Sequence, residues 1–556
     1  MFKFICSCIF LVIFSCKNEH NTIKNSQFEL EIADKNPTVL SEELPKDFRE
    51  FKELDSKYIN VTKLWSSFYS DLEGFTDSEY EILKPFIIEQ DISAIQQNIA
   101  RGDLSYELLT KFYLYRIRKY DRENECSLNS VISLNKNAIE LARIADKTRF
   151  IDVPHPIFGM PILLKDNINS SDMPTTAGAE VLKDNLTDDA FVVQQLKKQG
   201  AIILGKTNLS EWAYFFCGDC PSGYSAIGGQ TLNPYGRRIF DTGGSSSGSA
   251  VAVAANFCVA AVGSETSGSI LSPSSQNSVV GLKPTIGLLS RSGIIPISST
   301  LDTAGPMTKN VMDNAIVLDA MLGEDLTDNK SLDALWLNGF YEEIRQSSTL
   351  HGKRFGVFER LMEDSLYNQA IEDVKKLGAQ IIKVKEQSRK LPNFINLLNL
   401  DMRKDLPNYL TNYATSLIEV KSVTDIINYN SKDSLNVMPY GQRLFRGIVE
   451  DDGDAQYLKA IKDSLKIIGK SYFDIPSKVN LLDGFLSINN YHAGLAAVAE
   501  YPAITIPMGY SKKGEPKGLT IIGKPLSEKQ LINYAYAYEQ LTHKRSVPLN
   551  YHEIVK

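Results

Sequence analysis

The sequence has few histidines, few cysteines and no surplus of positive charge. Its 556 residues include six histidines and seven cysteines, so a Ser–His–Asp arrangement has few candidates and a disulfide scaffold is excluded. Lysine and arginine number 60 against 67 aspartates and glutamates, which gives a net charge of −7. No basic stretch suited to nucleic acid is visible, so we expect no nucleic-acid partner.

A long apolar run is also missing. The run at residues 4–14 is too short for a membrane-spanning helix, which needs about twenty residues. With 43% hydrophobic and 23% charged residues, the composition is that of an ordinary folded protein with a large core.

The N-terminus has the pattern of an exported lipoprotein. Lys3 supplies a positive charge, an apolar run follows at 4–14, and the run ends at Cys16. This order is typical of a secretory signal, and its end resembles a bacterial lipobox, in which the cysteine is lipidated. We predict a signal peptide at 1–15, a lipid anchor on Cys16 and a polar tether at 16–45. The protein would then lie in the bacterial cell envelope, on the periplasmic side of a membrane. The alternative is an ordinary cleaved signal in which Cys16 is incidental.

The remainder, 46–556, is predicted to be one large α/β domain. Helical spacing dominates 46–150, and strands alternate with helices in a catalytic core at 151–340. Longer helices interrupt this alternation at 345–480, a variable helical insertion, and the alternation returns at 481–556. Such alternation predicts a mostly parallel sheet covered by helices on both faces.

Several apolar runs are the expected strands of that sheet. They lie at 162–164, 201–204, 258–262 and 503–507, with expected helices at 190–199 and 527–542. Parallel strands that are buried on both faces carry such continuous apolar runs.

Two Gly/Ser-rich segments, 243–250 and 263–270, stand out as chemistry-bearing loops. Small residues let the backbone approach a ligand and present N–H groups to an anion. The Gly-Lys-Ser/Thr ending of a phosphate loop is absent, and so is the GxSxG pattern of α/β-hydrolases. A serine nucleophile in these loops would need another kind of base.

Lys165 is the candidate base, because His155 and His492 are better explained as structural residues. It follows an apolar run directly and precedes Asp166. A lysine at such a place is partly desolvated, which lowers its pKa and can leave it neutral. A surface lysine at a strand end is the alternative interpretation.

Together with the two Gly/Ser segments, further motifs resemble the amidase signature family. They lie at 159–166, 206–212, 229–234, 281–285 and 501–508, within a match that runs from about residue 95 to 547. The segments 290–297 and 302–307 look closest to the peptide-amidase branch. The resemblance implies a mixed, mostly parallel twisted sheet.

The resemblance also implies a Ser–Ser–Lys triad. Lys165 is then the catalytic lysine, Ser269 the nucleophile, and Ser245 the bridging serine after a cis Gly244–Ser245 peptide. Neither a metal nor an organic cofactor is needed for this chemistry.

Further contacts complete the expected site. Backbone N–H groups of Thr266, Ser267, Gly268 and Ser269 should surround the oxyanion. Ser246 and Asp302 are expected as supporting residues.

The expected activity is hydrolysis of a carboxamide through an acyl-enzyme at Ser269, with release of ammonia or an amine. The substrate is a small-molecule or peptide amide, and a peptide C-terminal amide is one candidate. The alternatives are a glutamine amidase like the A subunit of an amidotransferase, and a non-catalytic lipoprotein that binds amides or peptides. Residues 345–480 and 214–216 are expected to shape the substrate pocket.

Cys217 and Cys220 form an isolated CxxC pair. No second CxxC and no nearby histidine accompany it, so a metal site is not indicated. A local disulfide and two free thiols both remain open.

Overall fold

The computed structural model describes residues 51–122, 124–149, 155–332, 337–344 and 349–551. The predicted signal peptide at 1–15, Cys16 and the tether at 16–45 lie outside these residues, so their roles stay predictions. Among the described helices, none is both long and apolar enough to cross a bilayer.

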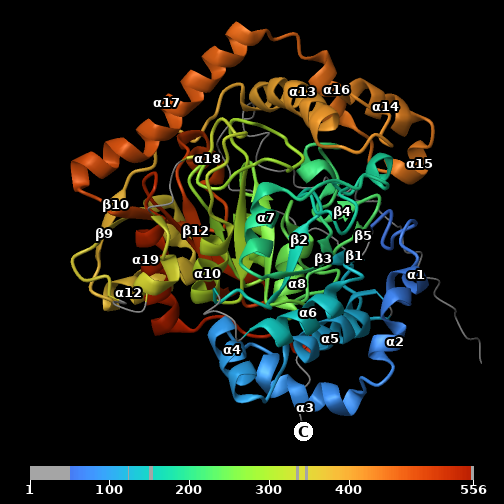
Figure 1. Cartoon of the computed structure of the whole chain (residues 1–556). Helices are drawn as coiled ribbons and strands as arrows, with labels where there is room; N and C mark the ends of the chain where they lie inside the picture. The colour runs from blue at the N-terminus through green and yellow to red at the C-terminus, as the bar shows by residue number, and fades with distance from the viewer. Residues whose placement is uncertain (1–50, 123, 150–154, 333–336, 345–348, 552–556) are drawn as a thin grey trace, which may run out of the picture.

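An eleven-stranded sheet forms the centre of the molecule (Figure 1), in the order β1-β3-β2-β6-β8-β7-β12-β13-β11-β9-β10. Its strands are β1 (Val131–Leu134), β2 (Pro161–Lys165), β3 (Ile202–Thr207), β6 (Ala260–Glu265), β7 (Val280–Lys283), β8 (Thr303–Thr308), β9 (Arg354–Phe358), β10 (Gln380–Val384), β11 (Gly484–Ile488), β12 (Ala503–Tyr510) and β13 (Pro516–Ile522). The pairs β3–β2, β2–β6, β11–β9 and β9–β10 are parallel, and the other neighbours are antiparallel. A separate hairpin joins β4 (Tyr224–Ser225) to β5 (Gly229–Gln230).

Helices cover the sheet, as Figure 1 shows. Those before the core are α1 (Val61–Trp65), α2 (Tyr69–Leu72), α3 (Asp77–Ile87), α4 (Ile92–Arg101), α5 (Tyr106–Ile117) and α6 (Ala138–Thr148). The core adds α7 (Phe191–Lys198), α8 (Ser247–Ala254), α9 (Leu271–Gln276), α10 (Val311–Met321) and α11 (Phe340–Ile344). The rest are α12 (Ser365–Lys376), α13 (Phe394–Asn412), α14 (Val423–Ser431), α15 (Ser434–Val437), α16 (Arg443–Glu450), α17 (Ala455–Asn480), α18 (Ala493–Ala499) and α19 (Glu528–Thr542).

The prediction of a single α/β domain with a mixed sheet covered by helices is confirmed. The apolar runs expected as strands overlap β2, β3, β6 and β12, and every residue of β2, β3 and β6 is buried. The expected helices correspond to α7 and α19. Burial on both faces of the sheet explains why these strands are apolar throughout.

Residues 345–480 differ in part from the helical insertion that the sequence predicts. β9 and β10 lie in this stretch and extend the main sheet beyond β11, with α12 between them. The long helices begin only at α13. The helical part of the insertion is therefore 394–480.

Two hydrophobic clusters stabilise the described chain. The larger one surrounds the sheet and includes residues from Trp65 to Tyr551. The smaller one joins α13, α14 and α16 to residues 212–220. Helices of the insertion are thus attached to the core through their own apolar contacts.

Candidate active site

Lys165 ends β2, and its side chain is completely buried. Its Nζ lies 2.8 Å from Ser245 Oγ, 2.9 Å from Ser264 Oγ and 3.1 Å from the Ser264 carbonyl oxygen. The three contacting atoms are hydroxyl and carbonyl oxygens, and no carboxylate of the described residues forms an ion pair with this amine. Burial without a contacting counter-charge lowers the pKa of Lys165 to about 7, and the more distant charges of Asp302 and Glu265 oppose this fall.

These contacts also indicate where the lone pair of a neutral Lys165 points. A neutral amine has two N–H donors and one acceptor pair. The Ser264 carbonyl can only accept, and the Ser264 hydroxyl already accepts a hydrogen bond from Asn167 Nδ2 at 2.9 Å. If both N–H groups donate to Ser264, the lone pair is left for the hydroxyl proton of Ser245.

Ser245 lies just before α8 and follows a cis Gly244–Ser245 peptide bond, which the resemblance to the amidase signature family implies. Its carbonyl oxygen accepts a hydrogen bond from the Ser210 amide at 3.0 Å. The neighbouring Ser246 donates its hydroxyl to the Ser264 carbonyl at 3.0 Å and accepts from the Ser264 amide at 3.2 Å. Ser246 therefore ties the Ser245 loop to β6.

Ser269 lies in the turn between β6 and α9, and its side chain is buried. Its carbonyl oxygen accepts a hydrogen bond from the Ser246 amide at 3.1 Å, which joins the two serine loops. Within the described part of the chain, the Ser269 hydroxyl makes no hydrogen bond. Glu265 fixes the turn that follows, because its Oε2 accepts from the amides of Ile270 and Leu271 at 2.7 and 3.0 Å.

The backbone between β6 and Ser269 leaves a row of free donors. In the described chain, none of the amides of Thr266, Ser267, Gly268 and Ser269 donates a hydrogen bond to protein. Gly268 has a φ of +91°, a conformation that L side chains rarely adopt. Unpaired buried amides are rare, so this segment, here called the oxyanion loop (266–269), suits a ligand oxygen.

Asp302 supports this loop from the side. Its Oδ1 accepts the Thr266 hydroxyl at 2.5 Å, and its Oδ2 accepts the amides of Ile297 and Ser298 at 2.8 and 2.9 Å. Burial raises the pKa of Asp302 to about 6 despite these hydrogen bonds. Asp302 thus contacts the oxyanion loop directly, through Thr266.

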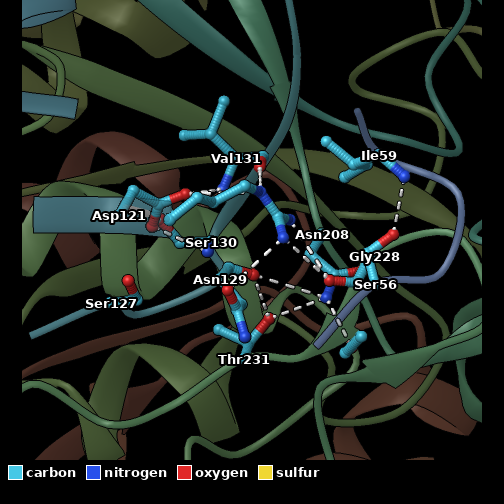
Figure 2. Close-up of polar contacts among 12 residues, drawn as sticks. Ser56, Ile59, Asp121, Ser127, Asn129, Ser130, Val131, Asn208, Gly228 and Thr231 are labelled. Atoms are coloured by element: carbon cyan, nitrogen blue, oxygen red, sulfur yellow. Dashed lines mark hydrogen bonds and ion pairs between the residues drawn. The ribbon is translucent and has the colours of Figure 1, made fainter. Parts of the chain in front are cut away.

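A polar network joins the residue that follows β3 to the chain before β1 (Figure 2). The Asn208 side-chain amide donates to Thr231 Oγ1 at 2.9 Å, and Thr231 donates to the Asn129 carbonyl at 3.0 Å. The backbone carbonyl of Asn208 accepts a hydrogen bond from the Gly248 amide of α8 at 3.0 Å. This network fixes the start of α8, and with it the position of Ser245.

A cavity of about 520 Å³ opens beside the site. Ser264, Thr266 and Asp302 line it on the side of the site, and α13 contributes Lys404 and Asp405. The lining combines these polar side chains with the apolar segment 294–297. Tyr214, Phe215 and Phe216, which the sequence suggests as pocket residues, instead pack in the smaller hydrophobic cluster, and Ala213 reaches the cavity in their place.

Cys217 and Cys220 form a disulfide. Its loop contacts the insertion, since the Phe216 carbonyl accepts from the Leu444 amide at 2.9 Å. Among the described residues, no group of three His, Cys, Asp or Glu side chains could hold a metal ion.

Ser264 and Asn167 belong to the site but were not predicted from the sequence. Ser264 contacts the lysine amine, and Asn167 donates to the Ser264 hydroxyl. A serine that follows an apolar run was the available signal for Ser264. Its direction toward Lys165 depends on β6 lying beside β2, which the sequence does not reveal.

Comparison with known proteins assigns the site to a family. The family model described as Amidase matches residues 108–532. A probable amidase of Arabidopsis thaliana is 35% identical over 83% of this chain and 92% of its own length. The native peptide amidase of Stenotrophomonas maltophilia superposes with a TM-score of 0.77 at 38% identity, covering 83% of this chain and 98% of that one. The A subunit of the glutamyl-tRNA(Gln) amidotransferase from Microcystis aeruginosa is 32% identical over 81% of this chain and 97% of its own length.

The matched region contains the lysine, both serine loops and the cavity described above. A small-molecule or peptide amide is the substrate class of such a site. The chain belongs to the amidase family and is an amide hydrolase.

Proposed function

We propose that the chain hydrolyses the carboxamide at the C-terminus of peptides through Lys165, Ser245 and Ser269. The observation that carries this proposal is the environment of Lys165. Its amine is completely buried, touches only neutral oxygens and lies 2.8 Å from Ser245 Oγ. An amine in such surroundings can be neutral at working pH and act as a base.

The reaction starts with proton transfer along the two hydroxyls. Lys165 takes the proton of Ser245 while Ser245 takes that of Ser269, whose Oγ attacks the amide carbon. The four amides of the oxyanion loop donate to the developing oxyanion, and one such donor is typically worth about 10²–10³ in rate.

The C–N bond breaks as Ser245 passes a proton to the leaving nitrogen, which departs as ammonia or an amine. An ester links the acyl group to Ser269 at this stage. Water then loses a proton to the same relay and attacks the ester, which releases the acid and restores Ser269.

The cavity favours a peptide over a fatty amide. Its lining includes Asn167, Arg291, Asp302, Lys404 and Asp405. A long alkyl chain would cover these groups without offering hydrogen bonds, and each buried polar group left unpaired costs about 1–3 kcal/mol. A peptide backbone can pair with such groups, and Asn167 Oδ1 is a buried acceptor that makes no hydrogen bond within the described part of the chain. Similarity to the peptide amidase of Stenotrophomonas maltophilia supports the same choice.

We further propose that the protein is exported and anchored through a lipid on Cys16. The pattern of residues 1–16 supports this location. The Cys217–Cys220 disulfide is also in keeping with an oxidising compartment. Mass spectrometry of the mature N-terminus tests the anchor, and an unmodified N-terminal peptide that begins downstream of Cys16 would exclude it.

A panel of amides tests the activity by release of ammonia. It should contain peptide amides, the matching free peptides, long-chain fatty amides and glutamine. We expect turnover of peptide amides, with loss of that turnover in Ser269→Ala. Preference for glutamine would favour the amidotransferase-like interpretation instead, and preference for fatty amides would contradict the argument from the cavity.

A fluorophosphonate probe tests the nucleophile independently of the substrate. The probe should label Ser269 in the wild-type chain and leave Ser269→Ala unlabelled. Absence of labelling at Ser269 in the folded wild-type protein would count against the acyl-enzyme and favour a binding protein.

A further inference from the structure

A second serine–histidine–acid cluster lies outside the amide-hydrolysing site. His492 Nδ1 is 2.6 Å from Ser487 Oγ, and His492 Nε2 is 2.9 Å from Glu386 Oε1. Ser487 belongs to β11, His492 immediately precedes α18, and Glu386 follows β10. The cluster therefore joins the extended edge of the sheet to the chain that returns to the core.

This cluster is not a second hydrolytic centre. Ser487 has no exposed surface and His492 is 1% exposed, so no substrate reaches the hydroxyl. Burial lowers the pKa of His492 although Glu386 opposes the shift, and a lowered pKa favours the neutral ring. Because a carboxylate only accepts, Nε2 carries the ring proton toward Glu386, and Nδ1 accepts the hydroxyl of Ser487. Both ring nitrogens are thus used to hold the side chain in one orientation.

Further residues fix Glu386 and the ring. Arg360 Nε donates to Glu386 Oε2 at 2.7 Å, and the Tyr472 hydroxyl donates to Oε1 at 3.1 Å. Burial opposes ionisation of Glu386, but hydrogen bonds from His492 and Arg360 hold its pKa below the ordinary value. The Phe358 ring stacks on His492 with centroids 4.1 Å apart.

The turn between β11 and α18 touches the oxyanion loop. A Cβ atom placed on Gly268 would meet Asn490 Nδ2 at 3.1 Å and Ala493 Cβ at 3.5 Å. One placed on Gly494 would meet Ser267 Oγ at 3.4 Å. Asn490 of the turn and Ala493 at the start of α18 therefore lie so close to Gly268 that a methyl group there would touch them, and Gly494 of α18 lies equally close to Ser267. Gly268 and Ser267 are residues that we assign to oxyanion binding.

Each end of this turn is fixed by a different set of bonds. At its start, Asn489 donates its amide to the Gly518 carbonyl at 2.9 Å and accepts the Gly518 amide through Oδ1 at 2.8 Å. At its end, the side chain of His492 is bound to Ser487 and Glu386. Loss of the histidine contacts would remove the side-chain bonds at this end and leave it held by backbone bonds, such as that from the Ala493 amide to the Asn490 carbonyl at 2.9 Å.

We propose that His492 is a positioning residue for amide hydrolysis: through Ser487 and Glu386 it holds the turn 489–493 against Ser267 and Gly268. This inference rests on the proposed role of the oxyanion loop. Misplacement of such a loop by about 1 Å can lower the rate by about 10²-fold without loss of the fold.

The test measures the rate at which a fluorophosphonate labels Ser269, separated into the maximal rate and the half-saturating probe concentration. His492→Phe keeps the ring on Phe358 but removes both hydrogen bonds. We expect its maximal labelling rate to fall about tenfold to hundredfold, with little change in half-saturation, because the donors are displaced while the probe still binds. His492→Gln keeps one N–H for Glu386 and should recover most of the rate.

His155→Phe is the control, because His155 also contacts an aromatic ring, lying edge-on to Tyr341, but makes no hydrogen bond or ring contact with the oxyanion loop among the described residues. It should label at the wild-type rate. Ser487→Ala is a milder second variant and should slow labelling less than His492→Phe does.

The outcomes separate the two proposals. Slower labelling in His492→Phe, or in Ser487→Ala should His492→Phe fail to fold, supports the positioning role. A wild-type maximal rate in the folded variants overturns it while the nucleophile assignment stands. Wild-type protein that is not labelled at Ser269 removes the proposed function, and the positioning role with it.

Discussion

Lys165 and Lys206 lie on neighbouring parallel strands, β2 and β3, and neither side chain is exposed. Their partners differ. Lys206 Nζ lies 3.2 Å from Asp166 Oδ1 and donates to the Ile168 carbonyl and the Thr175 hydroxyl at 2.6 and 2.8 Å. Lys165 touches hydroxyl and carbonyl oxygens only.

This difference in partners determines the role of each lysine. Burial lowers the pKa of Lys206 and raises that of Asp166, while the attraction between the two opposes both shifts. Lys165 has no such partner, so burial brings its pKa to about 7. One sheet thus holds a lysine that serves the fold and a lysine that is available for proton transfer. Four predictions test this contrast.

The largest effect is expected for Lys165→Met. Loss of the base should lower kcat/KM for amides by about 10³-fold or more, because general base catalysis and activation of the serine are lost together. The melting temperature should be kept or raised, since an apolar side chain replaces a buried amine that lacks a counter-charge. Retention of near-wild-type turnover would refute Lys165 as the base.

Lys206→Met is the matched variant, and its main effect should be a loss of stability. It leaves Asp166 buried without its partner, which should lower the free energy of unfolding by about 3–5 kcal/mol. Adding Asp166→Asn should recover part of that loss. Urea unfolding followed by circular dichroism measures both. If Lys206→Met unfolds like the wild type, the pair does not stabilise the fold as argued.

The pH dependence of kcat/KM in the wild type should show that the reaction requires neutral Lys165. Lys165 is protonated below its pKa, so kcat/KM should fall about tenfold per pH unit below about pH 7 and level off above it. The unfolded chain binds this proton up to about pH 10.5, so the same group makes the fold more stable as pH rises from about 7 to 10.5. An acid limb centred near pH 4 would indicate a carboxylate base.

The smallest effect is expected for Asp302→Asn. The negative charge of Asp302 raises the pKa of Lys165, so its removal should move the acid limb to lower pH by about half to one unit. Asp405→Asn is the control, because Asp405 lines the same cavity but is not among the charges that shift this pKa. Equal shifts in both variants would show that the effect is not specific to Asp302.

Much of the fold was readable from single segments. The apolar run before Lys165 predicts a strand buried on both faces, and β2 has that burial. The Gly/Ser segments predict close backbone approach, and the cis peptide and the unpaired amides lie there. β9 and β10 were not readable, because each is short and lies among charged residues. The antiparallel pairings between β6 and β11 could not be predicted either, because the alternation of strands and helices does not reveal strand direction.

Contacts between distant segments could not be predicted. Ser264 meets Lys165 only because β6 lies next to β2. Asp166 and Lys206 meet because β2 and β3 pair in a register that aligns Lys165 with Thr207. His492 and Glu386 meet across the sheet edge that the sequence assigns to a helical insertion. In each case no sequence motif marks the residues, and they meet only because of the order of the strands in the sheet.

β6 carries consequences for engineering. Its last residues bind the lysine amine through Ser264 and hold the turn after the nucleophile through Glu265, and the oxyanion loop follows directly. A shift of β6 would disturb both proton transfer and stabilisation of the oxyanion. A substitution in β6 therefore cannot change one of these functions without the other. α13 also lines the cavity, through Lys404 and Asp405, and these two residues are not part of β6. Libraries aimed at new amides should therefore vary α13 and leave β6 untouched.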